Sequence, residues 1–259
     1  MIAKTEEQKA GLIEAGRRLG AVLESLAGMV APGVSTATLE DEAVRLIADG
    51  GDVPAFLNYT PEGANRPYPA ALCISINEEV VHGIPNESPR ALKEGDIVAL
   101  DLGLIHEGYV MDSALTVPVG KVDAKAYALM NATQAALEAA IAAARPGNRT
   151  GDISYATGAA FKGTGFSVVK ALGGHGVGEH VHEEPFIAND GHPGTGEEIV
   201  AGMVLALEPI ANEGKASVVL APDGYTYRTR DGSRSAHFEH TILVTDGDPI
   251  VLTRRPSEK

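Results

Sequence analysis

Two short sequence patterns each occur twice, in the same order along the chain, and these internal repeats, called echoes below, constrain its fold more than any other sequence feature. In the first, Pro32-Gly33-Val34-Ser35-Thr36 is followed by Leu39, and Pro146-Gly147-Asn148-Arg149-Thr150 is followed by Ile153 at the same spacing. Each copy separates two segments whose apolar residues recur at helical spacing. This echo predicts a helix, a turn and a second helix in each half of the chain.

The second echo is an apolar run that ends in an acid. Its two copies are Gly95-Asp96-Ile97-Val98-Ala99-Leu100-Asp101 and Gly202-Met203-Val204-Leu205-Ala206-Leu207-Glu208, and each places a carboxylate at the sixth position after a glycine. Two echoes in one order favour a tandem duplication, whereas chance similarity of turns and strands is the alternative. We therefore predict one domain over residues 1–259, built from half-repeats of about 10–120 and 121–252.

Hydrophobic periodicity places the expected elements on this frame. The expected helices are 5–29, 36–48, 124–144 and 152–163. The expected strands are 71–76, 96–104 and 109–119, and from 166 onward glycine-rich turns should alternate with strands. This order predicts an α/β (α+β) fold in which antiparallel sheets are flanked by helices.

Charge and cysteine content exclude several classes of protein. The formal net charge of -14 argues against nucleic-acid binding, because non-specific binding of that kind requires a basic surface. Cys73 is the single cysteine, so no intrachain disulfide can form, which fits a reducing compartment. The N-terminal segment lacks the apolar core of a signal peptide, and no run approaches the roughly 18 apolar residues of a membrane span. We expect a cytoplasmic protein with no membrane contact.

Four acids lie inside or directly after apolar runs: Asp101, Asp112, Glu208 and Glu239. One such acid is usually explained by a place at the rim of a sheet or by a buried ion pair. Four acids with few basic neighbours favour a cation site, because carboxylates that converge repel one another. Asp101 and Asp112 fall on two expected strands joined by a turn, so a hairpin could place them face to face. Two divalent ions about 3.5–4 Å apart would neutralise such a cluster.

A histidine-rich segment supplies candidate nitrogen ligands. His175, His180 and His182 lie close together in the sequence, between glycines that allow close approach of the backbone. Neutral imidazole is the commonest nitrogen ligand of transition metals. A surface or core role is the alternative for any one of them, and it is the better explanation of His82 when that residue is considered alone.

Several long motifs resemble the methionine aminopeptidase family. They are Cys73–Pro85, Gly174–Gly178, His182–Pro185 and Ser235–Thr241. The resemblance extends from about Lys9 to Leu252. It implies the pita-bread fold, which consists of two pseudo-symmetric halves and agrees with the two echoes.

The resemblance also implies a set of metal ligands. These are Asp101, Asp112, His175, Glu208 and Glu239. In the family pattern Asp112 and Glu239 bridge two divalent ions, Asp101 binds one ion, and His175 with Glu208 binds the other. The residue types suit Co, Mn, Fe and Zn alike, and a monovalent cation is a further candidate.

The same resemblance assigns roles to other residues. His82 would contact the scissile amide nitrogen, His182 the carbonyl oxygen, and Glu208 would shuttle a proton. The expected methionine pocket comprises Tyr59, Tyr68, Cys73, His82, Val181 and Tyr225, with Phe56 nearby. This chain departs from the family pattern in several ways. The segment 60–70 is longer, and the chain has no tryptophan. Val181 replaces a common phenylalanine, and His237 replaces a common glutamine.

The implied activity is that of a type I enzyme that removes the initiator methionine from nascent proteins before small second residues. The connection from His175 to Glu208 is short, whereas type II enzymes carry a large insertion there. One alternative is an Xaa-Pro aminopeptidase or prolidase, which usually has an extra N-terminal domain. The other is a non-catalytic binding module, which would usually have lost ligands. We expect a monomer that acts on nascent N-termini, with the ribosome as a candidate partner.

Overall fold

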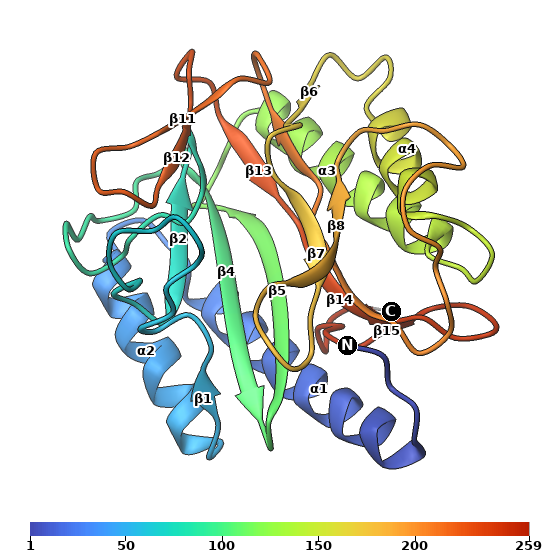
Figure 1. Ribbon diagram of the computed structural model, residues 1–259. Coiled ribbons are helices and arrows are strands. Elements are labelled where there is room, and N and C mark those ends of the chain that lie inside the picture. The colour runs from blue at the N-terminus through green and yellow to red at the C-terminus, as the bar shows by residue number, and fades with distance from the viewer. Residues whose placement is uncertain (259) are drawn as a thin grey trace.

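The computed structural model describes residues 1–258 of the chain (Figure 1). Within that range the helices are α1 (Glu6–Met29), α2 (Thr36–Asp49), α3 (Ala124–Ala143) and α4 (Thr150–Ala160). The strands are β1 (Val53–Pro54), β2 (Leu72–Ile76), β3 (Glu79–Val81), β4 (Ile97–His106), β5 (Tyr109–Pro118), β6 (Ser167–Val168), β7 (Gly173–Gly176), β8 (Glu183–Ala188), β9 (Val204–Leu207), β10 (Ile210–Asn212), β11 (Val218–Leu220), β12 (Tyr227–Thr229), β13 (Ser235–His237), β14 (His240–Leu243) and β15 (Ile250–Val251). None of these helices is long and apolar enough to cross a membrane.

Three of the four expected helices are confirmed to within a residue or so at each end. Thr5 caps α1 by accepting the amide N–H of the third helical residue, and Ser35 caps α2. The expectation for 152–163 is wrong at both ends, because α4 covers Thr150–Ala160. Asp152 accepts the N–H of Arg149 at 2.7 Å, so it caps the helix from inside the first turn instead of beginning it.

Two antiparallel sheets form the centre of the molecule. β5, β4 and β2 lie side by side in one, and β15, β14, β9, β7 and β8 follow one another in the other. α1 packs against β4 and β5, while α4 packs against β8 and α3 against β13 (Figure 1). Glu107 and Gly108 form the β4–β5 turn with positive φ at both positions, as a two-residue hairpin requires.

The two echoes adopt matching backbone conformations. Gly33 and Gly147 have φ of +90° and +88°, and Gly95 and Gly202 both have φ of +92°. The amides of Gly95 and Gly202 each donate to a valine carbonyl, at 3.0 and 2.8 Å. Positive φ at these four turns favours glycine. The matches support a duplication, and the exact division into half-repeats stays a prediction.

Three buried hydroxyls bridge β5 to the segment that contains β13 and β14. Thr241 Oγ1 donates to the carbonyl of Asp112 at 2.7 Å and accepts its N–H at 3.1 Å. Thr116 Oγ1 makes the same pair of bonds with His237, at 2.8 and 2.9 Å. Ser113 Oγ donates to a carbonyl beside β14 at 2.8 Å. These side chains satisfy main-chain groups at the junction of the two sheets.

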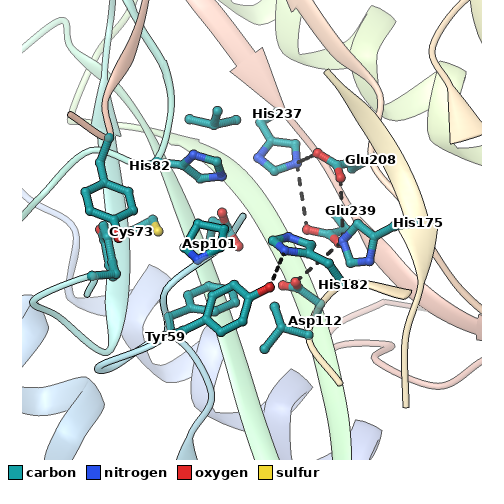
Figure 2. A pocket seen from close by; sticks show the side chains of 16 residues that line it. Tyr59, Cys73, His82, Asp101, Asp112, His175, His182, Glu208, His237 and Glu239 are labelled. Carbon is teal, nitrogen blue, oxygen red and sulfur yellow. Dashed lines mark hydrogen bonds and ion pairs between the residues drawn. The ribbon is translucent and has the colours of Figure 1, made fainter. Parts of the chain in front are cut away.

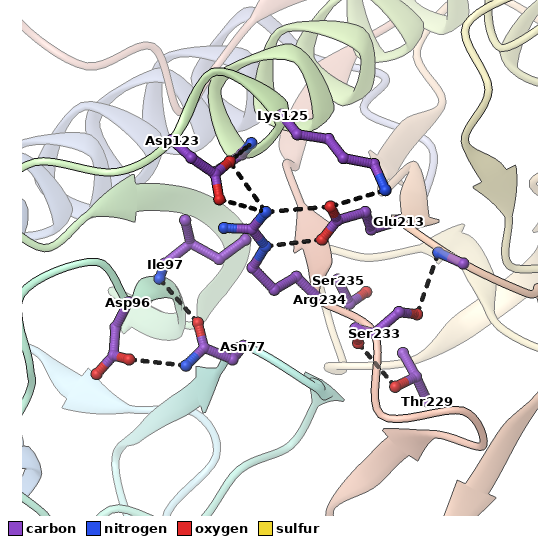
Figure 3. A network of polar contacts seen from close by, with 12 residues as sticks. Asn77, Asp96, Ile97, Asp123, Lys125, Glu213, Thr229, Ser233, Arg234 and Ser235 are labelled. Carbon is purple, nitrogen blue, oxygen red and sulfur yellow. Dashed lines mark hydrogen bonds and ion pairs between the residues drawn. The ribbon is translucent and has the colours of Figure 1, made fainter.

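A network of charged side chains holds the turn that leads into β13 (Figure 3). Arg234 donates two hydrogen bonds to Glu213, of 2.7 and 3.1 Å, and a third to Asp123 at 3.0 Å. Asp123 is also the N-cap of α3, and Lys125 pairs with Glu213 at 3.0 Å. The network therefore joins the start of α3 to the β10–β13 pair.

We expect Arg234→Met to lower the free energy of unfolding by about 1–2 kcal/mol. The substitution leaves the partly buried Glu213 carboxylate without its bidentate partner. The expected loss of stability lies between the losses typical of exposed ion pairs and of buried ion pairs. Lys125→Met is the matched control, since Lys125 is mostly exposed and should contribute about 0.5 kcal/mol or less. Urea unfolding of both variants measures the difference, and equal losses would contradict the assigned role of Arg234.

Candidate metal centre

The structure brings the five expected ligands to one cavity (Figure 2). Asp101 comes from β4, Asp112 from β5, His175 from β7, Glu208 follows β9, and Glu239 precedes β14. The cluster therefore draws on both central sheets. Side chains from distant parts of the sequence meet around a single space.

Asp101 and Asp112 share a face of the hairpin but are not directly opposite. Asp101 pairs with Ala114, and Gly103 pairs with Asp112. The expectation that the two acids stand face to face is therefore corrected to a diagonal arrangement. The two-residue turn sets this register, which displaces the acids along the strands while keeping them on the same face.

Glu208 and Glu239 lie at directly opposed positions of two neighbouring ladders. Leu207 pairs with His240 on one side of them, and Ile210 pairs with His237 on the other. Both pairs have the same strand register, and in this register Glu208 is directly opposite Glu239. The second half thus presents its two acids head-on, whereas the first presents them diagonally.

His175 has the geometry of a nitrogen ligand. Its Nδ1 donates to the carbonyl of Gly176 at 2.8 Å, which leaves the lone pair on Nε2. Nε2 lies 3.9 Å from Asp112 Oδ2 and 3.7 Å from Glu208 Oε1. Candidate ligand atoms of Asp112, His175 and Glu239 all lie within 4.8 Å of one another. One cation could contact all three of these side chains.

Several carboxylate oxygens of the cluster lack hydrogen-bond partners and could bind a metal ion. Asp101 Oδ1, Asp112 Oδ1 and Glu239 Oε1 are buried, and they have no hydrogen-bond partner among residues 1–258. Burial raises the pKa of Asp101 to about 7. Burial, and then repulsion by neighbouring acids, raises the pKa of Asp112, Glu208 and Glu239 well above the ordinary range. Divalent cations would remove this conflict by compensating the buried charge.

The histidines of the cavity are neutral at physiological pH. Burial lowers the pKa of His82 and His175 to about 4 and that of His237 to about 3, and it also lowers the pKa of His182. Neutral imidazoles can ligate metals and can donate or accept a proton. The site therefore joins acids that resist ionisation to imidazoles that resist protonation.

His82 and His182 line the same cavity and lie beside the acids (Figure 2). His182 Nδ1 lies 3.0 Å from the hydroxyl of Tyr59, and its ring centroid is 4.6 Å from that of His175. His82 has φ of +58°, a left-handed conformation, and Gly83 follows it in close contact with the carbonyl of Ile74. A side chain at position 83 would collide with that strand, so glycine allows His82 its place.

An apolar recess adjoins the acids. Tyr68 and Tyr225 meet edge to face with centroids 5.1 Å apart, and the Tyr68 hydroxyl donates to the carbonyl of Gly83 at 2.9 Å. Cys73 is buried, and burial raises the pKa of its thiol. The residues expected to form the methionine pocket, Phe56, Tyr59, Tyr68, Cys73, His82, Val181 and Tyr225, all line the cavity.

Three residues that line the cavity were not predicted as members of the site: Pro61, Val81 and His237. His237 lines the cavity, although the sequence marked it only as a replacement for glutamine. It lies two residues before Glu239, and side chains two apart on an extended segment share a face. That spacing is the signal that could have identified it.

The comparisons with known proteins agree with this geometry. Residues 10–246 match the model of metallopeptidase family M24. A methionine aminopeptidase of Aquifex aeolicus is 44% identical over 93% of this chain and 93% of its own length. The crystal structure of methionine aminopeptidase from Thermotoga maritima has a TM-score of 0.92 and 39% identity, covering 98% of this chain and all of its own.

The chain therefore belongs to metallopeptidase family M24 and, within it, to the methionine aminopeptidases, so it is a metalloaminopeptidase with the pita-bread fold. The prolidase from Pyrococcus furiosus, at 21% identity and a TM-score of 0.73, shares this fold. The match covers 98% of this chain but 65% of that prolidase. The alternative of a non-catalytic binding module is set aside by these relatives.

Proposed function

We propose that this chain is a type I methionine aminopeptidase that uses two divalent ions to remove the initiator methionine from nascent proteins. One observation carries the proposal: five side chains of ligand type surround a space that opens directly into an apolar, aromatic recess. A hydrolytic centre next to a side-chain pocket is the arrangement an aminopeptidase needs. The physiological setting we propose is the cytoplasm, with the enzyme acting as a monomer and the ribosome as a candidate partner.

Asp112 and Glu239 are the proposed bridging ligands, with Asp101 on one ion and His175 and Glu208 on the other. When bound, the ions would activate water and stabilise negative charge on the substrate carbonyl oxygen. They would also bind the free α-amino group, which restricts the reaction to the first residue. A monovalent cation elsewhere stays a prediction.

The chain's own groups complete the reaction. We assign His182 to the carbonyl oxygen of the substrate, where its contact with the Tyr59 hydroxyl at 3.0 Å helps to fix the orientation of the ring. His82 is assigned to the nitrogen of the scissile amide. Glu208 accepts the proton of the attacking water and delivers it to the leaving amine.

The recess supports selection of methionine. Its walls are the edge-to-face pair Tyr68 and Tyr225 together with the buried thiol of Cys73. An unbranched thioether suits such a space, because it is flexible and makes favourable contacts with aromatic rings. The hydroxyls of both tyrosines are engaged by main-chain carbonyls, of Gly83 and Arg66, so they leave little capacity for a polar side chain.

The short connection between His175 and Glu208 supports the type I assignment, since it leaves no room for a large insertion. A prolidase-like activity is the alternative. The relatives that match this chain over nearly their whole length are methionine aminopeptidases, which favours the first assignment.

Peptide turnover tests the proposal. We expect the protein loaded with Co²⁺ or Mn²⁺ to release methionine from Met-Ala-Ser, and chelation to abolish release until metal is restored. Met-Lys-Ser should react about 10-fold more slowly or worse, because a large second residue must enter a narrow cleft. Xaa-Pro peptides are the comparison, and their preferential cleavage would identify a prolidase instead.

A further inference from the structure

His237 occupies an unusual place between two acids of the centre (Figure 2). Its ring is buried, and Nε2 lies 3.7 Å from Glu208 Oε2 and 3.7 Å from Glu239 Oε2. Among the residues that the structure describes, neither ring nitrogen has a hydrogen-bond partner. The same carboxylate of Glu208 thus faces His175 with one oxygen and His237 with the other.

The backbone of His237 is held firmly. Its N–H and its carbonyl are both engaged by the hydroxyl of Thr116, and it pairs with Ile210 across the β10–β13 ladder. The ring is therefore presented from a fixed strand to Glu208 and Glu239. Such rigid support is what an orienting side chain needs, since its own position must not drift.

Comparison with His175 separates two roles for an imidazole. His175 donates its Nδ1–H to a carbonyl, so its Nε2 lone pair is free for an ion. His237 has no such acceptor at Nδ1 within residues 1–258, so a lone pair on Nε2 would leave a buried N–H unsatisfied. That same lone pair would also face two carboxylates. The other tautomer, with the proton on Nε2, avoids both penalties.

We propose that His237 is a positioning residue whose Nε2–H orients the carboxylates of Glu208 and Glu239 for the metal pair. At 3.7 Å the nitrogen lies outside hydrogen-bond distance of both acids in this structure, so the proposed contact requires a side-chain rotation that shortens the separation to about 3.2 Å or less. By contacting Oε2, His237 would set the rotation of the Glu208 carboxylate so that Oε1 faces His175. This inference rests on the metal centre proposed above and adds to it a residue that touches the ligands and not the substrate.

Two variants of similar size test the role by metal affinity. His237→Gln keeps an N–H donor at comparable reach, whereas His237→Met fills the space without one. Calorimetric titration of the chelated proteins with Mn²⁺ should give His237→Gln a Kd within about 3-fold of the wild type and His237→Met a Kd weaker by about 10–100-fold. The kcat for Met-Ala-Ser should follow the same order, while KM changes less. His192→Gln, at an exposed position after β8, is the control and should match the wild type.

Each outcome decides the matter. If His237 only filled space, methionine would be tolerated and a buried glutamine would be the worse variant, which reverses the expected order. Equal weakening in both variants would make the imidazole itself a ligand and overturn the positioning role. Failure of the wild type to bind Mn²⁺ would refute the proposed function instead. Thermal melts of the chelated proteins verify folding, and His237→Leu replaces His237→Met if the latter does not fold.

Discussion

Glu239→Gln and Asp112→Asn are each expected to reduce hydrolysis of Met-Ala-Ser by about 1000-fold or more, equivalent to roughly 4 kcal/mol of activation free energy. Each substitution keeps the shape of the side chain and removes one negative charge from the proposed bridging position. An amide is a poor bridge between two dications, so the ion pair should not assemble. The fold should survive, because the loss of one acid relieves repulsion among four buried carboxyls.

The measurement combines turnover with metal titration by calorimetry. Wild type should take up two equivalents of Co²⁺ or Mn²⁺, and each variant should take up one or none. Asp246→Asn removes an exposed acid near the C-terminus and is the matched control for loss of charge. Near-normal turnover by either bridging variant would count heavily against the assigned site.

The chelated protein is expected to lose stability as the pH rises from 6.5 to 8. Burial raises the pKa of Asp101 to about 7 and also raises the pKa values of Asp112, Glu208 and Glu239 well above their ordinary range. In this range the folded state therefore binds more protons than the unfolded state, whose acids titrate near 4. The free energy of unfolding should fall by about 1.4 kcal/mol per pH unit for each extra proton that the folded state holds.

The histidines offset this loss only in part, and only near the lower end of the range. The pKa values of His82, His175 and His237 are lowered by burial, so these rings are neutral in the folded state. The unfolded histidines are about half protonated at about pH 6.5 and largely neutral only above about pH 7.5, so their contribution ends within the lower part of the range.

Urea unfolding at pH 6.5 and pH 8 measures the effect, with chelator and with saturating Mn²⁺. Bound metal should flatten the dependence, because the carboxylates are then ionised in the folded state and compensated by the ions. Glu239→Gln with chelator should show a smaller decline than the wild type. A chelated protein whose stability rises over this range would contradict the proton count.

The sequence predicted those parts of the fold that depend on local patterns. The Pro-Gly turns separate α1 from α2 and α3 from α4, as the first echo predicted, and the structure shows Thr5 and Ser35 as the caps of the first two helices. Caps and turns need only a few neighbouring residues, so sequence carries them well. The acids of the centre were found for a related reason, because a carboxyl within an apolar run is unusual wherever the chain folds.

The predictions that failed were those that depended on strand register and on side-chain partners. The diagonal placement of Asp101 and Asp112 follows from the turn at Glu107 and Gly108, where one residue more or less would change every pairing. Asp152 could equally begin a helix or cap it from the third position. The sequence marked His237 only as a departure from the family, because Glu208 after β9 and Thr116 of β5, which it contacts, are distant from it in the sequence.

The hydroxyl bridges between the two sheets have a consequence for ion selectivity. Thr116 and Thr241 fix the distance from β5 to the strand that carries Glu239, because side-chain oxygens take the place of a continuous backbone ladder there. A change from threonine to valine would preserve either strand while loosening the gap between them. The spacing of the five ligands, on which the size of a bound ion would depend, is therefore set in part by residues outside the ligand set.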